Sequence, residues 1–433
     1  MAFSARDIRA DFPILDRRVH NQPLVYLDSA ATSQKPRQVI EAINNYYVHH
    51  NANVHRGVHV LSDESTQAWQ DSRQIIAGFF SADPSQLILT RNATESLNGV
   101  AYGWADHNLE PEDVIAVTHM EHHANFVVWQ QAAKRNNARL HVLDIDEQGR
   151  LDLEKAAAQL AHWGQRLKLV ALTHVSNTTG VVNPVEEVIA VCRRLEKKAG
   201  QPIRVVVDGA QSAPHLPVDF QSLDVDFFVF SGHKMLGPMG VGGLLVKHDL
   251  LTSGQLRPWL FGGGMISAVF TDRTDFHPQP DERFTAGTPD VASAAGLAAA
   301  CRYLQALGMD QVEAWDRQLV SYALERLGEL PEIELIGPTQ ARPGAVQLDR
   351  VGSVAFLYRG VHAHDVAQVL DSEGVEVRSG HHCTMPLHLK FGWQATTRAS
   401  FQVYSTKQDI DRLLDGLSKV KQIFVGPRPA VAP

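Results

Sequence analysis

Strand-like and helix-like segments alternate along the first half of this 433-residue chain, and this alternation limits its fold more than any other feature. Short runs rich in β-branched and aromatic residues predict strands. They lie at residues 86–89, 113–117, 139–143, 167–172, 203–207, 226–230 and 241–246. Apolar residues at helical spacing predict helices between them, at residues 36–49, 62–80, 125–136, 153–163 and 184–198. The alternation predicts an α/β fold, with a mostly parallel seven-stranded sheet flanked by helices.

The pattern changes after Pro289. An alanine-rich helix is expected from Ala292 to Leu307, followed by a further helix and shorter strands up to Val425. A chain of this length can bury the cores of two domains. We therefore expect a large domain at residues 16–290 and a smaller α+β domain at 291–425. The tail 426–433, which is rich in proline and alanine, is expected to be disordered.

Composition indicates a large cytoplasmic enzyme and excludes several other classes. Forty basic against 48 acidic residues give a formal net charge of −8, which argues against a nucleic-acid partner. The chain starts without the apolar segment of a secretory signal, and it has no apolar run long enough to span a membrane. Its three cysteines are too few for a disulfide framework and suit a reducing compartment.

One lysine stands out by its position. The segment Val225-Asp-Phe-Phe-Val-Phe-Ser-Gly-His-Lys234 leads an apolar strand directly into a polar turn that ends at Lys234. A lysine buried in such a place loses hydration, its pKa falls, and its amine can form a Schiff base with pyridoxal 5'-phosphate (PLP). The alternative is a solvated loop lysine.

A second segment favours the first interpretation. Ile203-Arg-Val-Val-Val-Asp-Gly-Ala-Gln-Ser212 reads as a buried parallel strand with Asp208 at its carboxyl end, where open α/β sheets bind ligands. A carboxylate there can keep the pyridine nitrogen of PLP protonated. Asp208 could instead cap a helix. Together, however, Asp208 and Lys234 predict a PLP site.

Two further motifs carry candidate chemistry. In Arg91-Asn-Ala-Thr-Glu-Ser-Leu97 a helix is expected to begin after a strand, which forms an anion site, although Thr94 could be an ordinary N-cap. In Arg378-Ser-Gly-His-His-Cys-Thr-Met-Pro386 the nearby Arg378, His381 and His382 could supply the positive field that favours a Cys383 thiolate. The alternative for Cys383 is a buried position, which the polar loop argues against.

The other two cysteines and the adjacent histidines indicate no second reactive or metal-binding site. Cys192 and Cys301 are expected to be buried on helices, because their neighbours are apolar. No metal site is expected, because adjacent residues such as His381, His382 and Cys383 do not easily share one tetrahedral centre.

These motifs resemble those of group II (SufS-type) cysteine desulfurases, within the class V aminotransferase-like PLP enzymes of fold type I. The resemblance covers nearly the whole chain. It is carried by Asp11-Phe-Pro-Ile-Leu15, Tyr26-Leu-Asp-Ser-Ala-Ala31, Asn53-Val-His-Arg-Gly57, Ala93-Thr-Glu-Ser96, Glu121-His-His-Ala-Asn125, His174-Val-Ser-Asn177, Val207-Asp-Gly-Ala-Gln211, Ser231-Gly-His-Lys234, Ala286-Gly-Thr-Pro289, Arg378-Ser-Gly-His-His-Cys383 and Arg398-Ala-Ser400.

The resemblance implies roles for individual residues. Thr94, Ser231 and His233 would hold the cofactor phosphate, and Thr288 would reach in from the other subunit of a homodimer. His122 would stack on the pyridine ring and take part in catalysis. Gln211 would bind the phenolic oxygen, and Asn177 would lie near that oxygen and the substrate carboxylate. The substrate-binding residues would be Arg398, Arg378, Asn177 and His55. Residues 1–15 would pack on the smaller domain.

The reaction implied is the conversion of L-cysteine to L-alanine, with Lys234 as base and a persulfide formed on Cys383. The persulfide would pass to a sulfur acceptor protein of the SufE or SufU type, for iron–sulfur cluster assembly. Selenocysteine lyase activity, a class V PLP aminotransferase or lyase that does not use the thiol, and a catalytically silent docking protein stay open as alternatives. The sequence departs from the usual family pattern at Thr178–Thr179, Met239, Gly264, Thr285 and Ser405, which leaves subunit contacts and the acceptor undefined.

Overall fold

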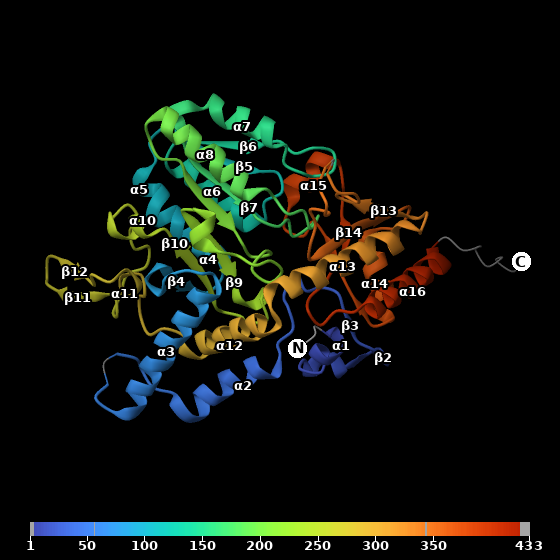
Figure 1. Ribbon diagram of the computed structural model, residues 1–433, viewed down its shortest axis with the longest axis horizontal. Coiled ribbons are helices and arrows are strands. Elements are labelled where there is room, and N and C mark those ends of the chain that lie inside the picture. The colour runs from blue at the N-terminus through green and yellow to red at the C-terminus, as the bar shows by residue number, and fades with distance from the viewer. Residues whose placement is uncertain (1–3, 56, 343, 425–433) are drawn as a thin grey trace, which may run out of the picture.

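A seven-stranded sheet forms the centre of the larger part of the molecule (Figure 1). The computed structural model describes residues 4–55, 57–342 and 344–424. The strand order is β4-β10-β9-β8-β7-β5-β6. The strands are β4 (Leu87–Thr90), β5 (Val114–Thr118), β6 (Arg139–Leu143), β7 (Leu167–Thr173), β8 (Arg204–Asp208), β9 (Phe227–Ser231) and β10 (Gly242–Val246). All seven lie within one residue or so of the predicted positions, and the fold class is confirmed.

The sheet is mostly parallel because helices connect its successive strands. β9, β8, β7, β5 and β6 pair in parallel, whereas β10 is antiparallel to both β9 and β4. In register, Asp208 lies beside Thr173 of β7 and Val229 of β9. The carboxyl ends of the parallel strands therefore meet at one edge, where Asp208 stands.

Helices cover both faces of this sheet. Successive side chains of one strand pack on opposite faces. Val205 and Val207 belong to one apolar cluster and Val206 to the other. The first face is covered by α3 (Val60–Phe79), α7 (Leu153–His162), α8 (Val185–Ala199) and α12 (Val291–Leu307). The second is covered by α4 (Ala93–Val100), α6 (His123–Arg135) and α10 (His248–Thr252). α2 (Arg37–Asn45) packs against α12, which lies between it and the sheet region.

A second, four-stranded antiparallel sheet lies beside the first, at the right in Figure 1. Its order is β13 (Ile333–Ile336), β14 (Ser353–Tyr358), β17 (Thr396–Ser400) and β16 (Arg378–Gly380). α13 (Met309–Gly328), α14 (Ala363–Ser372) and α16 (Lys407–Phe424) form its apolar cluster with it. The domain boundary expected at residue 291 stays a prediction; α12 packs on α2 and α3, and the helices of the second sheet begin with α13.

The N-terminal segment ties the two parts together. After α1 (Ala5–Arg9), a 3-10 turn (Pro13–Asp16), β1 (Arg18–Val19) and β2 (Gln22–Pro23), the strand β3 (Val25–Tyr26) pairs in parallel with β15 (Val375–Glu376). Arg9 donates to Asp409 near the start of α16, and Tyr303 of α12 donates to Asp11. Arg37 of α2 also donates its amide to the Asp11 carbonyl at 2.8 Å, so residues 4–15 contact elements on both sides of the expected boundary. The predicted disordered tail, 426–433, lies outside the described residues.

The remaining elements are short. They are the turns Tyr46–His50, Pro84–Gln86, Ala101–Ala105, Gly164–Arg166 and Gly232–Lys234, and the elements α5 (Asp106–Asn108), α9 (Phe220–Leu223), β11 (Ile266–Val269), β12 (Thr274–Phe276), α11 (Pro280–Arg283) and α15 (Met385–Phe391). The β11–β12 hairpin stands away from the main sheet, at the left in Figure 1. No helix in the described ranges is both long and apolar enough to cross a membrane.

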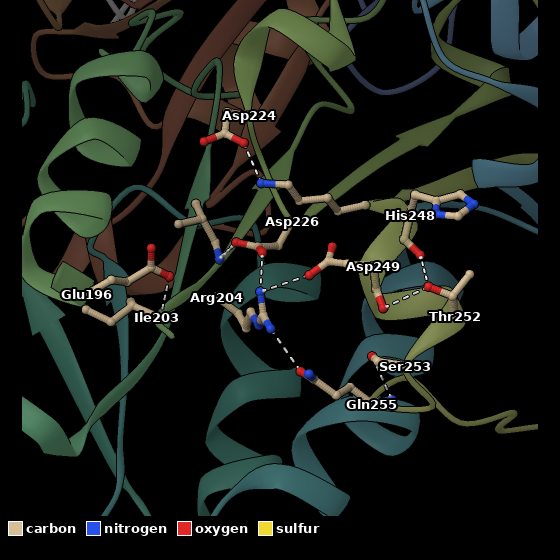
Figure 2. Close-up of polar contacts among 12 residues, drawn as sticks. Glu196, Ile203, Arg204, Asp224, Asp226, His248, Asp249, Thr252, Ser253 and Gln255 are labelled. Carbon is tan, nitrogen blue, oxygen red and sulfur yellow. Dashed lines mark hydrogen bonds and ion pairs between the residues drawn. The ribbon is translucent and has the colours of Figure 1, made fainter. Parts of the chain in front are cut away.

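A buried ion network joins the amino ends of β8 and β9 to α8, and Figure 2 shows its Arg204–Asp226 pair. Asp226 is fully buried and accepts from Arg204 at 2.9 Å, from Arg193 at 2.8 Å and from the Val205 amide at 2.8 Å. Nearby, Lys247 contacts the exposed Asp224. This network lies at the strand ends opposite Asp208 of β8.

Candidate active site

A cavity of about 530 Å³ opens at the carboxyl ends of the parallel strands. It brings together most of the site residues expected from the sequence. These are Thr94, His122, Asn177, Asp208, Ser231, His233, Lys234, Arg378, Cys383 and Arg398. They come from both sheets and from the loops between them, so the fold collects residues separated by up to about 300 positions.

Asp208 and Lys234 both line this cavity, and their opposite charges attract each other. Asp208 ends β8, and Lys234 ends the turn Gly232–Lys234 that follows β9. Burial raises the pKa of Asp208 and lowers the pKa of Lys234, and the attraction between them opposes both shifts. Asp208 accepts from the Ala210 amide at 3.0 Å, while the Lys234 amine makes no hydrogen bond within the described part of the chain. The amine is therefore free to react.

The amino end of α4 supplies donors to one side of the cavity. Asn92 is the N-cap and accepts from the Glu95 amide at 3.0 Å, so the alternative of Thr94 as the cap is wrong. Thr94 lies in the first turn and lines the cavity, and Ser231 accepts from the Ala93 amide at 3.0 Å. A helix start with hydroxyl groups beside it suits a bound anion such as phosphate.

Two histidines of the cavity are held neutral. His122 caps α6 by accepting at Nδ1 from the Ala124 amide at 3.1 Å, and burial lowers its pKa to about 3. Burial also lowers the pKa of His233 to about 4, with contributions from Lys234 and Lys35. Because both rings stay uncharged near neutral pH, they can pack against a flat ligand or donate one hydrogen bond.

Arg398 and Arg378 reach the cavity from neighbouring strands, β17 and β16, and share one carboxylate. Asp28 accepts from Arg398 Nη2 and from Arg378 Nε, each at 3.2 Å. Arg398 Nη1 donates to the Asn177 carbonyl at 2.7 Å. Its Nε is buried and has no hydrogen-bond partner among the described residues. Because Arg398 also lines the cavity, a ligand there can come within reach of this guanidinium.

Cys383 is exposed at the cavity, whereas Cys192 and Cys301 are buried, as expected. It has a left-handed backbone with φ of 59°, and so does His382 before it, with φ of 51°. Non-glycine residues rarely adopt this conformation, and neighbouring structure has to hold it. His123 does so by donating its amide to the Cys383 carbonyl at 2.7 Å.

The expected source of positive field at Cys383 needs a correction. His382 is buried, its Nε2 lies 2.9 Å from the Thr396 hydroxyl, and burial lowers its pKa to about 2. It is therefore neutral and supplies no charge. The cations that interact electrostatically with Cys383 are Lys234 and Arg398.

Three expected residues lie outside this cavity. Gln211 is buried behind it and donates to the Ala30 carbonyl at 2.8 Å. His55 and Thr288 line a different cavity of about 510 Å³, together with Gly264 and Thr285. Within one chain, the structure does not bring His55 or Thr288 to Lys234.

Three ionisable residues close to the site have no role that the sequence motifs imply. Asp28 holds both arginines, and Lys35 lies under the Lys234 turn. Glu121 is fully buried beside His122, accepts from Thr118 and Asn125 at 2.6 Å each, and burial raises its pKa to about 8. Asp28 and Glu121 fall within quoted motifs and Lys35 lies four positions after one, but only the folded chain shows what these residues contact.

Comparison with known proteins gives a consistent result. The family model Aminotransferase class-V matches residues 25–413. A "Probable cysteine desulfurase" from Streptomyces coelicolor is 46% identical over 96% of this chain and 97% of its own length. The apo structure of the cysteine desulfurase from Thermococcus onnurineus has a TM-score of 0.87 and 37% identity, covering 97% of this chain and 98% of that one. A mutant of C-DES with glycine covalently linked to the PLP cofactor has a TM-score of 0.79 and 27% identity, covering 95% and 98%.

Proposed function

We propose that this chain, which belongs to the class V aminotransferase family, is a PLP-dependent cysteine desulfurase that produces L-alanine and a persulfide on Cys383. The observation that carries the proposal is the meeting of an exposed thiol with a free buried amine and a buried acid in one cavity. Relatives named cysteine desulfurase at 42–46% identity over nearly the full length support it.

The residues of the cavity fit the cofactor at three points. Lys234 offers an unpartnered amine for covalent attachment, Asp208 would interact with the ring nitrogen, and the start of α4 with Thr94, Ser231 and His233 suits the phosphate. His122 would stack on the ring. Gln211, which does not line the cavity, would have to reach the phenolic oxygen from its buried position beside it. When bound, PLP takes up the electrons released when a bond at the substrate Cα breaks.

The protonation states of Asp208 and Lys234 decide which proton transfers the site can carry out. Burial favours the neutral form of both groups. A neutral Lys234 amine can accept a proton from the substrate Cα. Asp208, once opposite a basic ring nitrogen, would keep a proton between the two atoms.

Arg398 and Arg378 would orient the substrate. Arg398, which lines the cavity, would bind the substrate carboxylate, and Arg378 would add its charge from the rim. The side-chain amide of Asn177 donates to the His382 carbonyl at 2.7 Å. Asn177 would therefore hold the loop that carries Cys383 against the cavity wall.

The sulfur step balances without an added oxidant. The Cys383 thiolate attacks the substrate sulfur, the carbon–sulfur bond breaks, and its electrons pass to the substrate carbon, which is protonated to give alanine. The former substrate sulfur stays on Cys383 as a persulfide. Lys234, which becomes positively charged when it takes the Cα proton, and Arg398 would then lie near the attacking sulfur with their positive charges.

The test compares alanine and sulfide release from L-cysteine, with a thiol reductant, in the wild type and in Cys383→Ala. We expect the variant to lose both products while it keeps the visible absorbance of bound cofactor. Cys192→Ala is the matched control, since that thiol is buried and away from the cavity, and it should retain both products. Undiminished turnover in Cys383→Ala would favour a thiol-independent lyase. Absence of cofactor absorbance in the wild type would favour a silent docking protein. The same assay with L-selenocysteine measures the preference between sulfur and selenium.

We further propose that the working form is a homodimer. His55 and Thr288 line a cavity separate from that of Lys234, so a second copy would have to bring them to the site. Sedimentation should then give a dimer, and Thr288→Ala should weaken cofactor binding.

The exposure of Cys383 supports transfer of its sulfur to an acceptor protein of the SufE or SufU type, for iron–sulfur cluster assembly in the cytoplasm. All three cysteines are free, which suits a reducing compartment. Addition of an acceptor of either type should raise the turnover of L-cysteine.

A further inference from the structure

The carbonyl of His233 accepts hydrogen bonds from four donors of one N-terminal segment, Thr32–Lys35. The donors are the Thr32 hydroxyl at 3.0 Å, the Ser33 amide at 2.9 Å, the Ser33 hydroxyl at 3.1 Å and the Lys35 ammonium at 3.0 Å. A carbonyl oxygen has two lone pairs, so this one is more than saturated. The Ser33 hydroxyl also accepts from the Leu236 amide at 2.9 Å, beyond the turn Gly232–Lys234.

Lys35 is an unusual member of this cluster because it is charged and mostly buried without an acid. It forms no ion pair within the described ranges, and its ammonium contacts the Ser33 carbonyl, the Ser33 hydroxyl and the His233 carbonyl. Burial lowers its pKa to about 8. A buried ammonium without a carboxylate costs free energy, so its presence calls for a specific role.

The His233 carbonyl belongs to the peptide group whose nitrogen is that of Lys234. The Lys234 amine has no hydrogen bond among the described residues, so its position depends on its own backbone. Fixing the His233 carbonyl therefore fixes the point from which the Lys234 side chain enters the cavity. Lys35 itself is not among the residues that line that cavity.

We propose that Lys35 is a positioning residue for Lys234, which acts by binding the His233 carbonyl and holding the backbone of the turn. The inference rests on the proposed function, since it concerns the lysine that would bind PLP. Burial is the main cause that lowers the pKa of His233, and the charges of Lys234 and Lys35 act in the same direction.

The test is Lys35→Met, which keeps an unbranched apolar side chain and removes the ammonium group. Apoprotein is mixed with PLP, and the rate of covalent capture at Lys234, with loss of one water, is followed by visible absorbance and by borohydride trapping. We expect capture to slow about tenfold, and kcat per bound cofactor to fall about tenfold, since small misplacements of reacting groups have effects of at least this size. KM for L-cysteine should stay unchanged, because Lys35 does not reach the cavity.

Two companion variants keep the test decisive. Lys197→Met, at an exposed lysine of α8, should match the wild type in every readout. Ser33→Ala removes another side-chain donor to the same carbonyl, and it should slow capture in the same direction even if Lys35→Met does not fold.

The inference is overturned if Lys35→Met, or Ser33→Ala in its place, captures PLP at the wild-type rate with unchanged kcat. If the wild type itself captures no PLP, the proposed function fails and the inference fails with it. The wild-type reaction therefore separates the two failures.

Discussion

Arg398 has its three guanidinium nitrogens in three different environments. Nη1 donates to a backbone carbonyl, Nη2 donates to Asp28, and Nε has no partner in the described structure. The protein thus uses both Nη atoms to hold the group and leaves the Nε–H as an unused donor. A planar, rigid fork can satisfy both demands at once, whereas the point charge of a lysine cannot.

We therefore predict that Arg398→Lys raises KM for L-cysteine about tenfold or more, which corresponds to about 1.4 kcal/mol or more of lost binding. The cofactor absorbance should be retained, because Asp208 and Lys234 are untouched. Steady-state kinetics with a spectrum of each preparation measure both quantities. An unchanged KM would show that the carboxylate binds elsewhere.

At this scale the sequence was informative about residue type and weak about environment. Lys234, Asp208 and Cys383 could be chosen because each ends a strand or lies in a polar loop, and these features are local. The charge of His382 could not be predicted, because its neutrality comes from burial beside Thr396. The contacts of Lys35 were equally hidden, since its partner carbonyl lies 198 positions away.

At the scale of elements, the strands could be predicted closely because most are apolar runs, rich in β-branched or aromatic residues, that helices bury on both faces of the sheet. β8 and β9 consist only of buried residues. Helix ends were less accurate. The helix expected to reach residue 49 ends at Asn45 and continues as a wider turn over Tyr46–His50, which no propensity in the sequence indicates.

The ion network at the amino ends of β8 and β9 gives a prediction at this scale (Figure 2). Asp226→Ala would leave the largely buried Arg204 without its closest carboxylate and the Val205 amide without its acceptor. Removing one partner of a buried pair costs about 3–5 kcal/mol. Urea unfolding should show a loss of this size. Asp224→Ala, at an exposed partner of Lys247 in the same view, should cost less than about 1 kcal/mol. Equal losses would contradict the account.

For the whole molecule, buried neutral histidines make stability depend on pH. Burial lowers the pKa of His174 to about 4 and of His382 to about 2, against 6.5 for both groups when solvated. Between those values the unfolded chain binds protons that the folded chain excludes. The contribution of these histidines to the free energy of unfolding is therefore largest above pH 6.5 and falls as the pH drops toward 4.

His174 provides the sharpest test, because it is buried outside the active-site cavity and its Nδ1 has no hydrogen-bond partner among the described residues. From its pKa shift, one such group removes about 2 kcal/mol of stability between pH 7 and pH 5. His174→Phe keeps a planar ring without a titrating nitrogen, so its stability should fall by about 2 kcal/mol less than that of the wild type over this range. Urea midpoints at the two pH values measure the difference, which is independent of any constant effect of the substitution. His107→Gln, at an exposed histidine, is the control and should lose as much as the wild type. If His174→Phe also loses as much, the folded protein protonates His174 readily, and its acid sensitivity comes from other groups.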